Sequence, residues 1–205
     1  MKKRTLAFKL IAGGIIAVLI PLLAVGIFSS MKASSALETA AKDRSVKGAG
    51  KLADMVQEVL TVETKVVSEI ALSSDAVNAA GGSGADVMSK KLAEAMGKIG
   101  KDYETMTVTD ANGIVVADGS NGEYKGMSFA DRDYFQKAKA GKVNVGTAVK
   151  SKTTGNPVVS IAAPIIKDGA FAGIATIVLK IDYLSEKVTA KMGKTGYGFM
   201  IDQTG

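Results

Sequence analysis

Apolar residues fall into three patterns along the chain: one unbroken run, one long helical repeat and several short alternating segments. The unbroken run covers residues 10–28, LIAGGIIAVLIPLLAVGIF, nineteen residues without a charge. As an α-helix it would span about 28 Å, close to the roughly 30 Å hydrocarbon core of a bilayer. Such a helix tolerates Pro21 when the freed carbonyl group finds another donor. We therefore predict a membrane-spanning helix at residues 10–30.

The flanks of this run predict its orientation and leave one alternative. Four basic residues come before it, namely Lys2, Lys3, Arg4 and Lys9. By the positive-inside bias, residues 1–9 stay in the cytoplasm and the chain after residue 30 lies outside. A cleaved signal peptide with Ser34 and Ala36 at its cleavage site is the alternative, but its apolar core usually has about 7–15 residues. We favour an uncleaved anchor in a bacterial inner membrane, with residues 31–205 periplasmic or extracellular.

The helical repeat follows the anchor. Residues 31–79 contain no proline, and apolar residues recur there every three or four positions. The repeat consists of Leu52, Met55, Val56, Val59, Val66, Val67 and Ile70. It predicts a long amphipathic helix, broken near Gly48 and Gly50. More than forty helical residues span about 60 Å, which favours a periplasmic stalk that packs on a partner helix over a core helix. GGSG at 81–84 ends this segment, and a second short helix is predicted at about 87–99.

Short alternating segments begin at Tyr103. The stretch TMTVTDANGIVVADGS predicts two strands joined by DANG at 110–113, where asparagine and glycine accept a positive φ. A helix at 131–140 follows, closed by Gly141. Three more strands are expected at 143–150, 157–166 and 171–181, with turns at 153–156 and 167–169 between them. The fold class is therefore α+β: residues 80–182 form a membrane-distal module with an antiparallel five-stranded sheet that is covered on one face.

The end of the chain repeats the start of this module. GFMIDQTG at 198–205 resembles MTVTDANG at 106–113, since both are apolar strands that run into Asp, two residues and Gly. After a connecting helix at 183–196, we expect residues 197–205 to be the first strand of a truncated membrane-proximal module. Because an unpaired strand is not stable alone, the 205 residues are expected to be a fragment.

Composition and charge exclude several classes of function. The net charge is +6, but residues 31–205 carry 22 basic and 20 acidic groups, so most of the excess lies in the N-terminal flank. No basic stripe interleaved with aromatic residues is present, and we expect no nucleic-acid partner. The chain has neither cysteine nor histidine, which removes thiolate chemistry and the commonest general base and metal ligand. An enzyme, a metal site and a cofactor are not expected.

Three segments carry a resemblance to a known family: DRDYFQKAKAGK, TTGNPVVSIAAPI and GIATIVLKIDYL. In this order they resemble successive signature segments of the double Cache domain of bacterial transmembrane receptors, most often methyl-accepting chemotaxis proteins. The resemblance implies PAS-like modules that sense a small-molecule ligand outside the cytoplasm. It also implies a homodimer through the long helix, and a cytoplasmic chemotaxis kinase and coupling protein reached through a C-terminal part beyond these residues.

The same resemblance implies a ligand site. Family members that bind amino acids hold the ligand carboxylate with an arginine and, after one residue, two aromatics; an aspartate at the end of the last strand takes the ammonium. Arg132, Tyr134 and Phe135 match the first pattern, with Tyr134 in place of the usual tryptophan, and Asp182 matches the aspartate. A guanidinium group suits this role because it forms two parallel hydrogen bonds with a carboxylate.

Two further candidates and a purely structural interpretation complete this prediction. Ser151 falls at another polar ligand position, and Tyr124 is the candidate for a tyrosine that often precedes the arginine, although its spacing of eight is long. Alternatively, Asp131 caps a helix, Arg132 pairs with a surface acid, and the two aromatic residues belong to the core. We expect Asp133 to be solvated or structural. Asp110 and Asp202 are expected to be turn residues.

These observations predict the ligand-sensing region of a transmembrane chemoreceptor that binds a small carboxylated ligand, such as an amino acid; an organic acid or a small amine stays open. The first alternative keeps the sensor and changes the output to a histidine kinase, a diguanylate cyclase or a phosphatase. The second is an anchored extracellular binding module without a transmitter.

Overall fold

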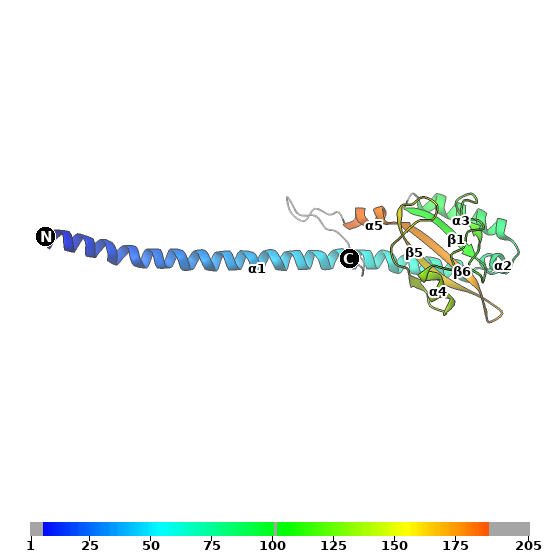
Figure 1. The fold of residues 1–205 in the computed structure, drawn as a ribbon, viewed down its shortest axis with the longest axis horizontal. Coiled ribbons are helices and arrows are strands. Elements are labelled where there is room, and N and C mark those ends of the chain that lie inside the picture. Colours follow the sequence, from blue (N-terminus) through cyan, green and yellow to red (C-terminus); the bar gives the residue numbers. More distant parts are fainter. Residues whose placement is uncertain (1–5, 101, 189–205) are drawn as a thin grey trace. The chain divides into compact units, whose positions relative to one another are not determined.

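The computed structural model describes residues 6–100 and 102–188 (Figure 1). The chain divides into two compact units at Gly50. Helix α1 (Leu6–Leu72) contributes to both units. Several predictions concern residues outside these ranges. They are the basic residues Lys2, Lys3 and Arg4, the last part of the connecting helix, the strand at 197–205 and the turn residue Asp202.

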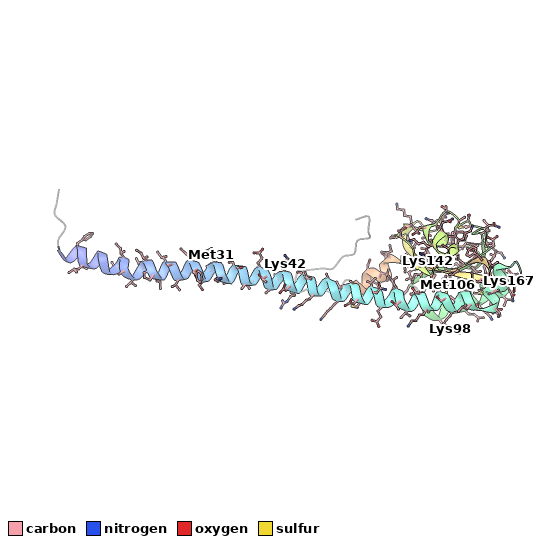
Figure 2. The ribbon with its side chains drawn as sticks, turned by 90° about the horizontal axis from the view of Figure 1, so that it is seen from below. Met31, Lys42, Lys98, Met106, Lys142 and Lys167 are labelled. Carbon is pink, nitrogen blue, oxygen red and sulfur yellow. The ribbon has the colours of Figure 1, made fainter. Side chains whose placement is uncertain are left out.

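Helix α1 carries the predicted membrane segment. It is long and apolar enough to cross a bilayer, and none of its apolar window is buried in the protein. Met31, just after this segment, is 68% exposed, whereas Met106 in the second unit is fully buried among other side chains (Figure 2). The predicted break near Gly48 and Gly50 does not occur, because a helix-interior glycine costs only about 1 kcal/mol relative to alanine.

Three helical segments in the second unit precede the sheet. Helix α1 ends at Leu72, earlier than the predicted 79, because Ser73 has extended backbone angles and its hydroxyl oxygen accepts the N–H of Ala76. Helix α2 (Ser74–Ala80) then ends at Gly81, and helix α3 (Ala85–Ile99) begins after Gly84, which has a φ of 73°. The predicted second helix is thus confirmed.

An antiparallel sheet forms the centre of this unit. Its order is β2-β1-β6-β5-β3, and β4 also pairs with β5. The strands are β1 (Tyr103–Thr109), β2 (Val115–Asp118), β3 (Asn144–Val145), β4 (Val149–Lys150), β5 (Pro157–Lys167) and β6 (Ala170–Lys180). Six strands replace the five predicted because the segment 143–150 is interrupted at residues 146–148, where the Thr147 N–H donates to the Asp133 carboxylate at 3.2 Å instead of to β5. A Cβ at Gly146 would lie 3.0 Å from the Tyr134 ring.

Both faces of the sheet carry a hydrophobic core, although the sequence analysis predicts only one covered face. Alternate residues of β5 and β6, such as Ile161 and Ile177, pack with the C-terminal turns of α1 and with α2 and α3. Ala162 and Ile174 face the other way and pack with helix α4 (Asp133–Lys139), which Figure 1 shows beside β5 and β6. The near-continuous apolar runs of β5 and β6 are the sequence signal for strands buried on both faces.

The predicted turns are confirmed. In the β1–β2 turn the Asp110 carboxylate accepts the N–H groups of Asn112 and Ile114 at 2.9 and 2.8 Å, and Gly113 has a φ of 82°. The β5–β6 hairpin turns at Asp168 and Gly169, both with positive φ. Asp110 is therefore a turn residue. Helix α5 (Ile181–Val188) begins two residues before the predicted connecting helix.

A buried hydrogen bond joins helix α1 to the sheet. The Tyr103 hydroxyl donates to Glu63 Oε1 at 2.5 Å, and Glu63 is only 6% exposed. The other carboxyl oxygen, Oε2, has no hydrogen-bond partner among the described residues. Burial raises the pKa of Glu63 above its ordinary value; the hydrogen bond from Tyr103 opposes this shift and the nearby Asp102 charge adds to it. The helix is thus held to β1 by a carboxyl group whose pKa is raised by burial.

Gly173→Ala is expected to destabilise the sheet by about 1–3 kcal/mol, the usual cost of forcing extra atoms into a packed interior. A Cβ at Gly173 would lie 1.9 Å from the Thr109 carbonyl oxygen, so the backbone of β1 would have to move. Thermal unfolding measures the loss. Gly97→Ala is the control, because nothing lies within 4 Å of its added methyl group; the two variants should therefore differ, and equal stability would contradict this packing.

Stability should depend on pH through Glu63. Its raised pKa means that the folded state keeps a proton at pH values where the unfolded carboxyl, with an ordinary value of 4.5, has lost it. This stabilisation is complete below the unfolded pKa and disappears as the pH rises through the folded pKa. Glu63→Gln removes the titration. We therefore expect the unfolding temperature of the variant, relative to the wild type, to increase from pH 4.5 to pH 8.

Thermal melts at half-unit pH steps test this expectation. Glu58→Gln, on an exposed position of the same helix, controls for the loss of one negative charge. A difference between Glu63→Gln and wild type that stays constant over the whole pH range would show that Glu63 does not titrate as described.

Candidate ligand site

A small cavity of about 20 Å³ lies on the α4 side of the sheet. Its floor consists of Val158, Ser160 and Val178. Along β5 and β6 these residues alternate with residues of the core on the α1 side of the sheet. Further polar lining comes from β1, from the segment before α4, and from the turn that joins β4 to β5. The polar and charged residues of the lining are Glu104, Tyr124, Arg132, Lys150, Ser151, Lys152 and Ser160.

The cavity brings together four of the six predicted ligand residues. Arg132, Tyr134, Ser151 and Tyr124 all line it. Tyr124 takes part despite its long spacing from Arg132, because residues 119–132 form an irregular connection rather than a helix. The prediction thus grouped side chains that come from three separate segments.

Phe135 and Asp182 lie elsewhere. Phe135 is 1% exposed and packs edge to face on Phe171, with ring centroids 6.0 Å apart. Consecutive helical residues project about 100° apart, and here Tyr134 lines the cavity while Phe135 points into the core. Asp182 is exposed in the first turn of α5, after β6 has ended at Lys180, and it does not line the cavity. The structure therefore places Phe135 in the core and Asp182 on the surface.

Arg132 is positioned by the start of helix α4. It has extended backbone angles at the N-cap position and makes no side-chain capping bond. Its guanidinium group donates one long hydrogen bond, 3.4 Å, to the Lys150 carbonyl oxygen. None of the ion pairs found between described residues includes Arg132. Most of its N–H donors are therefore available to a ligand in the cavity.

The two aspartates beside Arg132 have structural roles. Asp131 does not cap the helix; it pairs with Lys152 at 2.8 Å, and this hydrogen bond lowers the pKa of Asp131. Asp133 pairs with Lys137 at 2.9 Å and accepts the N–H of Thr147. Burial opposes the shift, but these two bonds still lower the pKa of Asp133. The alternative in which Arg132 pairs with a surface acid is thus not what the structure shows.

Aromatic rings form one wall. Tyr134 is 3% exposed and packs edge to face on Phe129, with ring centroids 6.1 Å apart. Burial raises the pKa of Tyr134 to about 12, although hydrogen bonding to Ser160 and the charge of Arg132 act the other way. The Tyr134 hydroxyl therefore stays protonated at neutral pH. Such a wall excludes water and strengthens the electrostatic contacts that a ligand makes beside it.

Glu104 is the one acid among the described lining residues, and it was not among the predicted ligand residues. Its Oε1 accepts the Tyr124 hydroxyl at 2.6 Å and its Oε2 accepts the Thr154 hydroxyl at 2.8 Å. Burial raises the pKa of Tyr124, and the bond to Glu104 adds to this shift. The pairing of β1 with β6 advances from Tyr103 opposite Leu179 to Thr105 opposite Val178, so Glu104 is the extra residue of a β-bulge. A bulge redirects its side chain, and no simple alternation along the sequence indicates it.

The 151–156 turn borders the cavity through Ser151 and Lys152. Ser151 Oγ accepts the N–H groups of Thr153 and Thr154, both at 3.2 Å, and thereby fixes the turn from within. Side chains tie this turn and its flank to their surroundings in four places. The ties are Arg132 to the Lys150 carbonyl, Lys152 to Asp131 and the Ser128 carbonyl, Thr153 to the Met127 sulfur, and Thr154 to Glu104. About 20 Å³ accommodates one water molecule, so a larger ligand requires the lining of the cavity to move, and Ser151 and Lys152 of this turn belong to that lining.

Comparisons with known proteins identify the fold. The sensor domain of the V. cholerae histidine kinase DctB matches with a TM-score of 0.60 and 15% identity, over 75% of this chain and 59% of that chain. The ligand-binding domain of the Campylobacter jejuni chemoreceptor Tlp3, in complex with 4-methylisoleucine, matches with a TM-score of 0.59 and 14% identity, over 71% of this chain and 60% of that chain. The ligand-binding domain of the Pseudomonas fluorescens chemoreceptor CtaA, in complex with L-serine, matches with a TM-score of 0.57 and 18% identity, over 73% of this chain and 63% of that chain.

At these identities the likeness shows a shared fold. The chain spans about 60% of the length of these solved sensor domains. No curated protein sequence matches it. Residues 32–205 match the Cache domain family. The chain belongs to this family, which confirms the resemblance found in the sequence.

Proposed function

We propose that this chain is the ligand-sensing region of a bacterial transmembrane chemoreceptor, and that it binds a small carboxylated ligand such as an amino acid in the cavity beside Arg132. The observation that carries this proposal is the guanidinium group of Arg132, which faces the cavity without an ion-pair partner among the described residues. The Tlp3 and CtaA domains, solved in complex with 4-methylisoleucine and L-serine, support it by analogy.

The chemistry of the site fits a carboxylate. A guanidinium fork and a carboxylate form two parallel, charge-assisted hydrogen bonds, and each is worth about 1.5–3 kcal/mol. Tyr134 and Phe129 shield these bonds from water. Binding involves no bond making or breaking, in keeping with a sensory role.

Signalling requires that the ligand bind one of two conformations more tightly than the other. The walls of the cavity include β1, β5 and β6, and these strands also pack on the C-terminal turns of α1. A ligand that moves the 151–156 turn or β1 would therefore change the packing of α1. A coupling free energy of about 1–3 kcal/mol is typical of such systems.

We propose that α1 anchors the chain in the inner membrane and that the residues after about 30 lie in the periplasm or outside the cell. The exposed apolar residues of α1 and the basic N-terminal flank support this placement. A homodimer through α1 belongs to the same proposal, as do the cytoplasmic chemotaxis kinase and coupling protein. Met55 and Val62 support the dimer: both are exposed apolar residues, and seven helical residues place them on one side of α1.

A second candidate is the sensor region of a histidine kinase, and the match to the DctB sensor domain favours it. Deleting the gene distinguishes the two outputs. Loss of swimming toward the ligand in a capillary assay supports a chemoreceptor. Intact swimming with loss of ligand-induced transcription supports the kinase.

Arg132→Ala should weaken binding by about 2–5 kcal/mol, which is roughly 30-fold to several thousand-fold in the dissociation constant, if the guanidinium holds a desolvated carboxylate. A thermal-shift screen of the full chain in detergent, against amino acids and small organic acids, first finds a ligand. Isothermal titration calorimetry then measures its affinity. Lys139→Ala, an exposed cation of α4 outside the cavity lining, is the matched control. Unchanged affinity in Arg132→Ala would rule out this role.

Single cysteines should report both membrane side and dimer contact, because the native chain has no cysteine. Met55→Cys and Val62→Cys are expected to react with a membrane-impermeant maleimide on intact spheroplasts, and to form disulfide-linked dimers upon mild oxidation in membranes. Gln57→Cys, about 200° around the helix from Met55, should label equally and cross-link less. Labelling only after lysis would overturn the placement. Absence of cross-links at Met55 and Val62 would overturn the dimer contact.

A further inference from the structure

We propose that Glu104 is the anionic pole of the cavity, so that the ligand carries a cationic amine that binds Glu104 as well as a carboxylate that binds Arg132. This inference rests on the proposed role of Arg132, and it defines the ligand class more narrowly. The acceptor of the amine is then a residue of β1, and not Asp182 beyond the end of β6.

The charges around the cavity support this assignment. Among the described lining residues, Glu104 is the only acid, and Arg132, Lys150 and Lys152 are the cations. Asp131 and Asp133 lie close by in sequence but are paired with lysines. None of the ion pairs between described residues includes Glu104. The cavity therefore holds one carboxylate whose charge has no cationic partner of this kind.

The hydrogen bonds of Glu104 leave room for an amine. The hydroxyl groups of Tyr124 and Thr154 each donate to a different carboxylate oxygen, at 2.6 and 2.8 Å. A carboxylate offers about four acceptor sites, so about two stay open to N–H donors. The two neutral hydroxyls fix the carboxylate in position without cancelling its charge. A half-buried carboxylate held in this way is suited to a protonated amine.

The backbone also directs Glu104 to this place. As the extra residue of the β1 bulge, Glu104 points to the cavity side, whereas its neighbour Tyr103 contacts Glu63 on the other face. Bulges of this kind often direct a side chain toward a functional site. Glu104 is half-buried and held by two hydrogen bonds, whereas Asp182 is exposed at the start of α5.

The Thr154 hydrogen bond connects amine binding with opening of the cavity. A ligand the size of an amino acid enters only if the lining moves, because the present volume is about 20 Å³, and the 151–156 turn contributes Ser151 and Lys152 to that lining. One of the four ties that hold the turn ends on Glu104 itself. An ammonium group has three donors, so it can replace the Thr154 hydroxyl as that tie is released.

Matched ligands test the proposal. For each amino acid that binds the full chain in detergent, calorimetry compares its affinity with that of the acid lacking the amine and of the amine lacking the carboxylate. We expect the acid to bind at least tenfold more weakly than the amino acid. Glu104→Gln should lower the affinity for the amino acid by about ten- to a hundredfold, so that the variant binds the amino acid no more tightly than the acid. Glu123→Gln, an exposed acid beside Tyr124 and outside the lining, should change neither.

Folding of the variants is checked by thermal unfolding. If Glu104→Gln does not fold, Glu104→Asp keeps the charge and should retain the preference for the amino acid over the acid, whereas Glu104→Ser should lose it. Equal preference in both variants would overturn the proposal.

The remaining outcomes separate this inference from the proposed function. If the acid binds as tightly as the amino acid, or if Glu104→Gln leaves amino-acid affinity unchanged, the role of Glu104 is overturned and the role of Arg132 stands. An amine without a carboxylate could also bind the wild type and Arg132→Ala but not Glu104→Gln. That result would support the role of Glu104 and contradict carboxylate binding by Arg132. If no acid, amine or amino acid binds, both are overturned.

Discussion

The structure of the sensing unit depends on how β1 presents two consecutive residues to opposite faces of the sheet. Tyr103 reaches the α1 side and donates to the buried carboxyl group of Glu63. Glu104, at the bulge, reaches the cavity and accepts hydrogen bonds from Tyr124 and Thr154. One strand therefore joins the proposed ligand site to the long helix. Because both contacts are short hydrogen bonds to carboxyl groups, neither residue can move without affecting a buried polar group.

The cavity holds only about 20 Å³, and the 151–156 turn forms one of its borders. The 151–156 turn is shaped internally by Ser151 and is tied to its surroundings by Arg132, Lys152 and Thr154. These ties are few, and two of them involve the residues proposed to bind the two ends of a ligand, Arg132 and Glu104. When the turn moves, Arg132 and Glu104 lose hydrogen bonds to it, and a bound ligand would form new hydrogen bonds with the same two side chains. The bonds to the ligand would then partly offset the free energy needed to move the turn. Such an exchange is a direct way to make binding depend on conformation.

Membership of the Cache family and the fold of its solved relatives agree with this architecture. The relatives include both chemoreceptor and histidine kinase sensor domains, so the fold is compatible with more than one output. The chemistry of the cavity comes from its side chains, which include a tyrosine at the aromatic wall and a glutamate on β1. Those side chains, and not the fold, therefore determine which ligand binds.

The sequence by itself determined the elements with strong local signals: the apolar run of α1, the turns at 110–113 and 168–169, and the helix that positions Arg132 and Tyr134. These depend on neighbours a few residues apart. Only the tertiary structure decided that Tyr124 and Ser151 join Arg132, that Phe135 is core, and that Glu104 faces the cavity. The reason is that a bulge in β1 and the break at Gly146 change side-chain direction through contacts with distant strands, and a local pattern carries no record of such contacts.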